Sequence, residues 1–157
     1  MIDFDTLRKD IVSGLSRAVH IPFIRSNQTG EPPAYPYGSY TITSLVVDQN
    51  GTWGEYEDGK HRKPFTQVWS ITIQSDKAGQ SMELCMRARE WLDHAGQIYL
   101  NDRHIIVQKV GAINNRDNLV TIEYEYRNGF DCVFWLMSET DSLSEETGTI
   151  ETVVYDE

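Results

Sequence analysis

Three carboxylates near position 125 of this 157-residue sequence, Glu123, Glu125 and Asp131, come closest to a catalytic pattern. Carboxylates that lie close together can hold a divalent metal or share acid–base work, as in a small hydrolase or nuclease. Glu123, Glu125 and Arg127 alternate along a predicted strand and therefore share one of its faces. The competing interpretation, which we favour, is the ion-paired face of a hairpin, formed by Arg116, Glu125, Arg127 and Asp131.

Other reactive side chains are too scattered to predict a site. The histidines are His20, His61, His94 and His104. Their spacing is not that of metal ligands. Cys85 and Cys132 are too few for a disulfide framework, and we expect both to be buried and inert. The sequence has neither a GxxxxGK[ST] nor a GxGxxG loop for phosphates. We therefore predict no catalytic residue, no metal and no cofactor.

The charge is strongly asymmetric along the chain. The sequence has 14 Lys and Arg against 24 Asp and Glu, a net charge of −10. Eight of the acids and none of the bases lie in residues 131–157, which leaves residues 1–130 nearly neutral. An acidic segment argues against a protein that grips DNA, because that affinity comes mainly from Lys and Arg on phosphates. Since no stretch approaches about 18 uncharged apolar residues and no secretory signal is recognisable, we expect no membrane partner and a cytosolic site of folding.

Two segments have the apolar spacing of amphipathic helices. The first is predicted over residues 3–19, capped by Asp3 or Asp5 and ended before Pro22. The second is predicted to begin near Asp76 and to end at Gly96. Its apolar positions are Leu84, Cys85, Ala88, Trp91, Leu92 and Ala95.

Five segments rich in β-branched and aromatic residues are predicted strands: 37–47, 65–74, 105–110, 119–126 and 130–137. Trp69, Ile71 and Ile73 alternate with polar residues, which indicates a sheet covered on one side. The Asn128-Gly129 dipeptide predicts a type I′ hairpin turn between the last two strands. The order of elements predicts a single α+β domain over residues 1–157, with an antiparallel or mixed sheet of about five strands and two helices packed on one face.

Three less regular segments leave this core. They are an extended, proline-rich arm over 20–37, a long inter-strand loop over 48–64 and an acidic C-terminal arm over 138–157. The arm and the loop carry exposed aromatic residues, and such rings dominate contacts between proteins. We predict a subunit or partner interface at Tyr35, Tyr37, Trp53, Tyr56 and Phe65. The alternative is that these rings pack back on their own domain.

Residues 71–134, together with residues 22–42 and the terminal GTIETV, resemble the neck terminator or tail-terminator-like family of tailed bacteriophages. The most specific pieces are the Asn-Arg-Asp turn at 115–117 and the segment from Tyr124 to Asp131. The pattern commonly has Arg at the position of Tyr126 and an aromatic residue at the position of Asn128.

The resemblance implies a structural virion protein with no catalytic residues, assembled in the host cytoplasm. Such a protein forms a ring, typically a hexamer, at the head-proximal end of the tail. The ring ends polymerisation of the tail tube, binds the head-connector or neck proteins, and leaves a channel through which DNA passes without being specifically bound. Glu145, Glu146 and Glu151 could line this channel and repel phosphates. The alternatives are another completion protein, such as a stopper or tube subunit, and the metal-dependent hydrolase.

Overall fold

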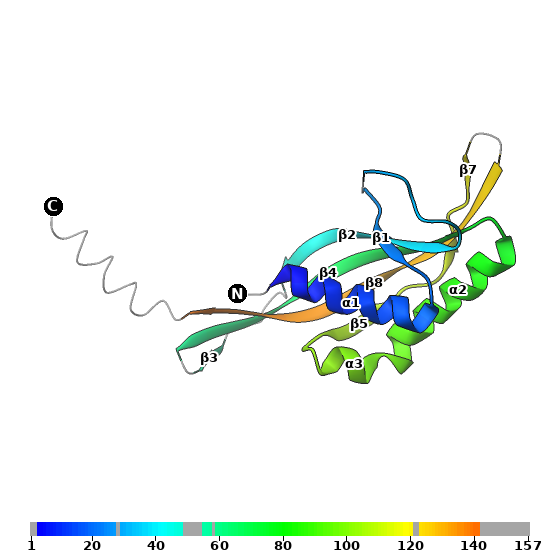
Figure 1. Cartoon of the computed structure of the whole chain (residues 1–157). Helices are drawn as coiled ribbons and strands as arrows, with labels where there is room; N and C mark the ends of the chain where they lie inside the picture. The colour runs from blue at the N-terminus through cyan, green and yellow to red at the C-terminus, as the bar shows by residue number, and fades with distance from the viewer. Residues whose placement is uncertain (1–2, 28, 49–54, 58, 121–122, 142–157) are drawn as a thin grey trace, which may run out of the picture.

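The computed structural model describes residues 3–27, 29–48, 55–57, 59–120 and 123–141. A long twisted sheet runs through the molecule, and the helices lie on one of its faces (Figure 1). The main strand order is β1-β2-β4-β8-β5, and β3, β6 and β7 pair at its margins. β1 is parallel to β2, whereas the other pairs are antiparallel. The predicted α+β fold with a mixed sheet and helices on one face is therefore confirmed.

Helix α1 (Phe4–Val19) forms where the sequence predicts it. The Asp3 side chain caps its first turn by accepting from the backbone N–H groups of Asp5 and Thr6. Its buried residues, Leu7, Ile11, Gly14, Leu15 and Val19, form one stripe that packs against the sheet and α2 (Ala78–Glu90). The helix ends at Val19 and is capped by His20, which has a left-handed φ of 62°.

The second predicted helix is three pieces. After α2 the backbone widens into a π-helical turn, η1 (Trp91–Ala95), and then continues as α3 (Gln97–Asn101) beyond Gly96. The prediction that Asp76 caps this helix is wrong, because Lys77 is the N-cap and has no side-chain cap bond. The Ser75 hydroxyl instead accepts from the Lys77 N–H at 3.0 Å.

The centre of the sheet is the pair formed by β4 (Lys60–Ser75) and β8 (Glu123–Asp141), which stays in register from Lys60 opposite Asp141 to Ser75 opposite Tyr126. The predicted alternation is confirmed, since Trp69, Ile71 and Ile73 are all buried. Trp69 stacks on Tyr40 of β2 (Tyr37–Asp48) and meets Phe134 of β8 edge-on. The core therefore lies between this sheet face and the helices.

The predicted hairpin turn at Asn128-Gly129 is wrong. Both residues lie inside β8, opposite Ile73 and Thr72. Asn128 is buried and donates to the Ser81 hydroxyl of α2 at 3.0 Å, so it joins strand to helix. The predicted strands at 119–126 and 130–137 are correspondingly redrawn: β7 (Asn118–Val120) pairs with the first residues of β8, and β8 then continues to Asp141.

The remaining strands shorten the predicted irregular segments. β1 (Phe23–Arg25) lies inside the predicted arm, and β3 (Glu55–Glu57) pairs with the beginning of β4 inside the predicted loop 48–64. Gly59, with φ of 74°, stands between these two strands. β5 (Ile106–Val110) matches its prediction, and the short β6 (Asn114–Asn115) follows it.

Candidate functional site

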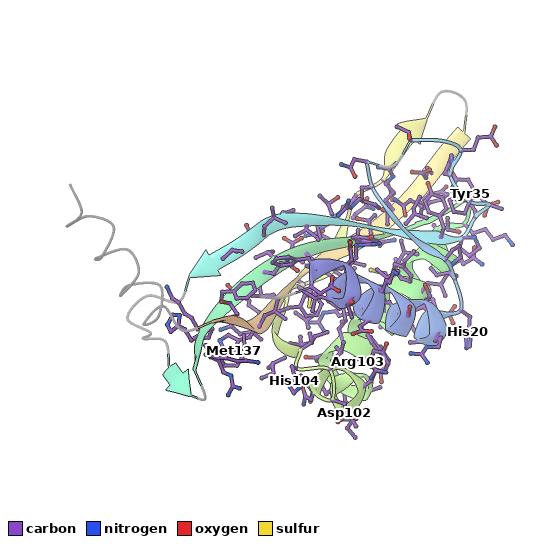
Figure 2. The ribbon with its side chains drawn as sticks, turned by 60° about the vertical axis from the view of Figure 1, so that its left-hand side comes forward. His20, Tyr35, Asp102, Arg103, His104 and Met137 are labelled. Atoms are coloured by element: carbon purple, nitrogen blue, oxygen red, sulfur yellow. The ribbon has the colours of Figure 1, made fainter. Side chains whose placement is uncertain are left out.

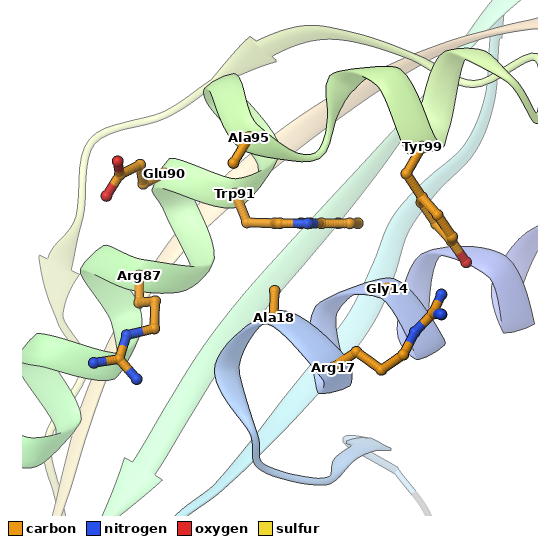
Figure 3. Close-up of a pocket in the computed structure, with 8 residues that line it drawn as sticks. All are labelled: Gly14, Arg17, Ala18, Arg87, Glu90, Trp91, Ala95 and Tyr99. Carbon is orange, nitrogen blue, oxygen red and sulfur yellow. The ribbon is translucent and has the colours of Figure 1, made fainter.

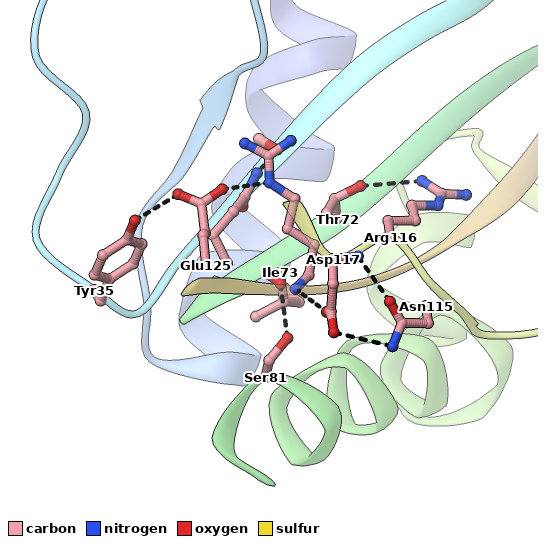
Figure 4. Close-up of polar contacts among 11 residues, drawn as sticks. Tyr35, Thr72, Ile73, Ser81, Asn115, Arg116, Asp117 and Glu125 are labelled. Atoms are coloured by element: carbon pink, nitrogen blue, oxygen red, sulfur yellow. Dashed lines mark hydrogen bonds and ion pairs between the residues drawn. The ribbon is translucent and has the colours of Figure 1, made fainter. Parts of the chain in front are cut away.

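A polar network on β8 and the neighbouring turn contains the four residues predicted to form ion pairs, Arg116, Glu125, Arg127 and Asp131 (Figure 4). Arg116 lies just after β6 and extends across the sheet. Its Nη1 donates to the hydroxyls of Ser70 and Thr72 of β4 at 2.7 and 3.0 Å, and its Nη2 lies 3.3 Å from the Asp131 carboxylate. One guanidinium therefore ties the turn to both central strands.

The Asn-Arg-Asp turn is fixed by its own side chains. The Asn115 side-chain oxygen accepts from the Asp117 N–H at 2.7 Å, and the Asp117 carboxylate accepts from the Arg127 N–H at 2.8 Å. The Arg116 N–H donates to the Arg127 carbonyl at 2.7 Å. Because Asn and Asp readily accept from nearby backbone N–H groups, this sequence sets the path of the turn against β8.

Glu125 is the centre of a second group. Its side chain is buried, with the residue 5% exposed, and it forms an ion pair with Arg127. It also accepts a hydrogen bond of 2.5 Å from the hydroxyl of Tyr35, which comes from the proline-rich segment before β2. That hydrogen bond is the main reason why the pKa of Tyr35 is raised to about 12. Burial raises the pKa of Tyr37, whose ring stacks on Tyr35.

Glu125 and Asp131 form polar contacts that connect parts of the fold. Glu125 and Asp131 are six residues apart on one strand, which separates them by about 20 Å and prevents them from sharing one ion. Each has an arginine partner. The side chain of Glu123 lies outside the described residues. Within the part of the chain that the structure describes, no group of three or more His, Cys, Asp and Glu side chains could hold a metal. Among the described side chains, the carboxylates that the hydrolase interpretation requires are therefore not brought together.

The predicted interface residues have different environments. Tyr35 is exposed, but Tyr37 is buried and packs on it. The expectation that Phe65 is exposed is wrong: it is 4% exposed and belongs to the core, because β4 begins at Lys60 and places Phe65 on the same inner face as Trp69. Trp53, the Tyr56 side chain and the three acids Glu145, Glu146 and Glu151 lie outside the described residues.

The two cysteines are buried and free. Burial raises the pKa of each thiol to about 12, so neither is a thiolate near neutral pH. A shallow groove lies between α1 and the consecutive helical segments α2, η1 and α3 (Figure 3). The ring of Trp91 covers Gly14 and Gly96 there, and Arg17 lies over the ring of Tyr99. Small residues in this groove let the helices approach each other closely, so we interpret the groove as a feature of helix packing and not as a binding site.

Exposed apolar side chains are the feature that sequence reasoning missed. Leu45 and Val46, near the end of β2, are 63% and 54% exposed. Ile106 and Met137 are exposed near the start of β5 and the end of β8. The available signal was the run Leu45-Val46-Val47, because three consecutive apolar residues break the alternation of a half-buried strand.

None of the described helices has the length and apolar character that crossing a bilayer requires. The model of one protein family, described as phage neck terminator protein, matches residues 7–157. A comparison with curated proteins finds no match.

Proposed function

The chain belongs to the phage neck terminator protein family, and on this basis we propose that its copies form a ring, of six subunits, at the junction of head and tail. Membership of the family makes it a structural protein of the phage neck and hence a virion component. In the proposed role the ring ends growth of the tail tube and joins the tail to the head connector. Its partners are copies of itself, the neck proteins and the tube protein.

The family match over residues 7–157 is the observation that carries this proposal. The polar network agrees with it, because Arg116, Glu125, Arg127 and Asp131 are used to fasten strands and a turn together. A rigid subunit is what a ring of fixed geometry needs. Tyr35 remains an exposed interface candidate, and Trp53 and Tyr56 remain candidates by sequence.

We also propose that DNA passes through the ring without specific binding. The support is electrostatic: the net charge is −10, and residues 142–157 contain Glu145, Glu146 and Glu151 but no Lys or Arg. Carboxylates along a channel repel the phosphates of DNA, so the duplex slides and does not adhere.

Negative-stain microscopy combined with light scattering on the purified protein tests the ring. Closed rings of a single size are expected, whereas a tube subunit would polymerise without limit. A phage lacking the protein tests the role itself. Tails of abnormal length, or tails that are not joined to filled heads, are expected; normal tails on filled heads would refute the proposed function.

A further inference from the structure

The end of β2 projects apolar side chains away from the sheet. The register passes from Ser44 opposite Val68 to Val47 opposite Thr66, so Leu45 and Val46 together face the single residue Gln67. Such a β-bulge re-aims the side chains that it contains. Leu45 and Val46 point to solvent as a result, with 63% and 54% of their surfaces exposed. Residues 45–47 are called the β2 bulge below.

The β2 bulge is held in place from inside the core. Gln67 is fully buried, and its side-chain amide donates to the Leu45 carbonyl at 3.2 Å. Its side-chain oxygen accepts from the Trp69 ring N–H at 2.7 Å. A buried polar side chain is costly unless its hydrogen bonds are made. The core therefore contains a dedicated polar link that keeps two apolar side chains exposed.

The sheet has an open edge on each side of this region. β1 pairs with β2 only from Gly38 to Tyr40, and among the described strands no other pairs with that edge of β2. At the other side β5 pairs only with β8 in the described part of the chain. Because adjacent strands from β2 to β5 alternate in direction, β2 of a second copy placed beside β5 would run antiparallel to it.

One row of paired residues runs across the sheet from the β2 bulge to Ile106 on β5. Val47 lies opposite Thr66, Thr66 lies opposite Trp135, and Trp135 lies opposite Ile106. When a subunit is rotated about an axis parallel to its strands, the position of each residue along that axis does not change. In a closed ring whose axis runs along the strands, the two different contact surfaces of each subunit must therefore lie at the same height. The β2 bulge and Ile106 meet this requirement.

A groove beside Ile106 offers a matching surface. It has a volume of about 920 Å³ and lies between α1, the end of α3 and the last part of β8. Figure 2 shows Met137, His104 and Arg103 at this end of the molecule, far from Tyr35. The apolar residues that line it are Leu7, Ile106, Trp135, Leu136 and Met137.

We propose that the β2 bulge of one copy packs into this groove of the next copy, an inference that rests on the proposed ring. Residues 43–47 contain no charged side chain, so the bulge would bring only apolar groups to the apolar part of the groove. The lining of the groove also includes ionisable side chains, among which Asp10 and Arg103 form an ion pair; they are Asp3, Asp10, Arg62, Arg103 and His104. The neighbouring bulge in β5, between Val107 and Lys109, and the exposed Lys109 disfavour extended strand pairing. The contact is accordingly made by side chains around one row of the sheet.

Cysteine cross-linking tests this contact. Val46 and Ile106 of one chain are separated by three strand spacings, about 14 Å, which exceeds the roughly 7 Å that a disulfide can span. A disulfide in the double variant Val46→Cys/Ile106→Cys therefore joins different copies. Cys85 and Cys132 are buried and do not interfere. The control is Val46→Cys/Met86→Cys, because Met86 is 60% exposed on α2 but does not line the groove.

Under mild oxidation we expect a ladder of covalent oligomers from the double variant, seen by non-reducing electrophoresis. A mixture of the two single variants should give dimers, and neither single variant alone should. Dimers from one single variant alone would overturn the proposal, since they indicate a two-fold contact. Cross-linking no greater than in the Met86 control would also overturn it. If the wild-type protein forms rings but the double variant does not cross-link, the proposed contact is wrong and the proposed function still holds.

Discussion

Gly129 lies where the side chain of Arg116 crosses the sheet. A Cβ atom built at this position would be 2.6 Å from the Ile71 carbonyl oxygen and 2.8 Å from the Arg116 guanidinium. Its φ is outside the left-handed region, so the glycine is required for close approach and not for a turn. The hydrogen bonds from Arg116 to Ser70 and Thr72 depend on this space.

The substitution Gly129→Ala is therefore expected to lower the free energy of unfolding by about 1–3 kcal/mol, because the methyl group displaces backbone or the guanidinium. Urea denaturation followed by circular dichroism measures the loss. Gly79→Ala is the matched control: a Cβ there meets nothing within 4 Å, and alanine in a helix is neutral or stabilising. Equal stabilities of the two variants would contradict this role of Gly129.

Tyr35 reports on Glu125. Its hydroxyl donates to the carboxylate, and ionisation would place two negative charges side by side, which raises the pKa of Tyr35 to about 12. The neutral amide of Glu125→Gln should return this pKa toward its ordinary value of 10. The sign follows: in the wild type the proton stays on folded Tyr35 while the unfolded chain ionises, so this pair's contribution to stability is lost as pH rises from about 10 to about 12.

NMR titration of the tyrosine ring carbons measures the shift, with Tyr35→Phe used to assign the signal. A Tyr35 pKa that is the same in the wild type and in Glu125→Gln would show that the hydrogen bond is not its cause.

Individual residues were predicted unevenly from the sequence. The carboxylates were expected to be ion-paired, and Glu125 and Asp131 do pair with arginines. The burial of Glu125 was not foreseen, because Tyr35, which is 90 positions away, covers it. Phe65 was placed on the surface although it has the same parity along β4 as Trp69. Extending the alternation backward through Phe65 would have corrected this.

Among the elements, β8 shows why local signals can fail. Asn-Gly is the strongest local signal for a hairpin, yet Asn128 donates to Ser81 on α2 and Gly129 admits Arg116. Both reasons are long-range contacts that no window of sequence contains. α1 was predicted accurately because its signals, the Asp3 cap and the stripe of apolar residues, are local.

The β2 bulge gives a prediction for an element. Gln67→Leu removes the partners of the Trp69 ring N–H and the Leu45 carbonyl, so we expect the free energy of unfolding to fall by about 2 kcal/mol. Assembly should weaken further than this loss of stability explains, because Leu45 and Val46 lose their fixed position. Chemical denaturation and sedimentation velocity measure the two effects.

Gln97→Leu serves as the control, since Gln97 donates to the Asp93 carbonyl on the exposed surface. It should change the stability by less than about 0.5 kcal/mol. If the Gln67→Leu variant is destabilised but still assembles like the wild type, the hydrogen bonds of Gln67 are not needed for the contact between subunits.

For the whole molecule, the sequence predicted that helices cover one face of a sheet, but it did not predict which strands form the edges of that sheet. Periodicity identifies which faces are buried, and these fix an α+β arrangement with helices on one side. The strand order and the matching row of Val47 and Ile106 depend on how distant segments pair. Pairing was therefore beyond what the pattern of apolar residues could specify.

Trp53 is expected to matter for assembly and not for folding of the single chain. Its segment lies in the predicted loop 48–64, whose aromatic residues are predicted to contact a neighbouring subunit. We expect Trp53→Ala to leave the melting temperature nearly unchanged and to reduce the oligomeric fraction in light scattering. Phe65→Ala is the contrasting variant and should cost about 3–5 kcal/mol of stability, because that ring is in the core. A large loss of melting temperature in Trp53→Ala would place Trp53 in the core.

The long pairing of β4 with β8 has a mechanical consequence. The two strands stay in register from Lys60 opposite Asp141 to Ser75 opposite Tyr126, along most of the length of the molecule. A pull along the strands loads all the rungs of this ladder together in shear, whereas a pull across them would open the rungs one by one. If the strands follow the axis of the virion, tension between capsid and tail meets the stiff direction of each subunit.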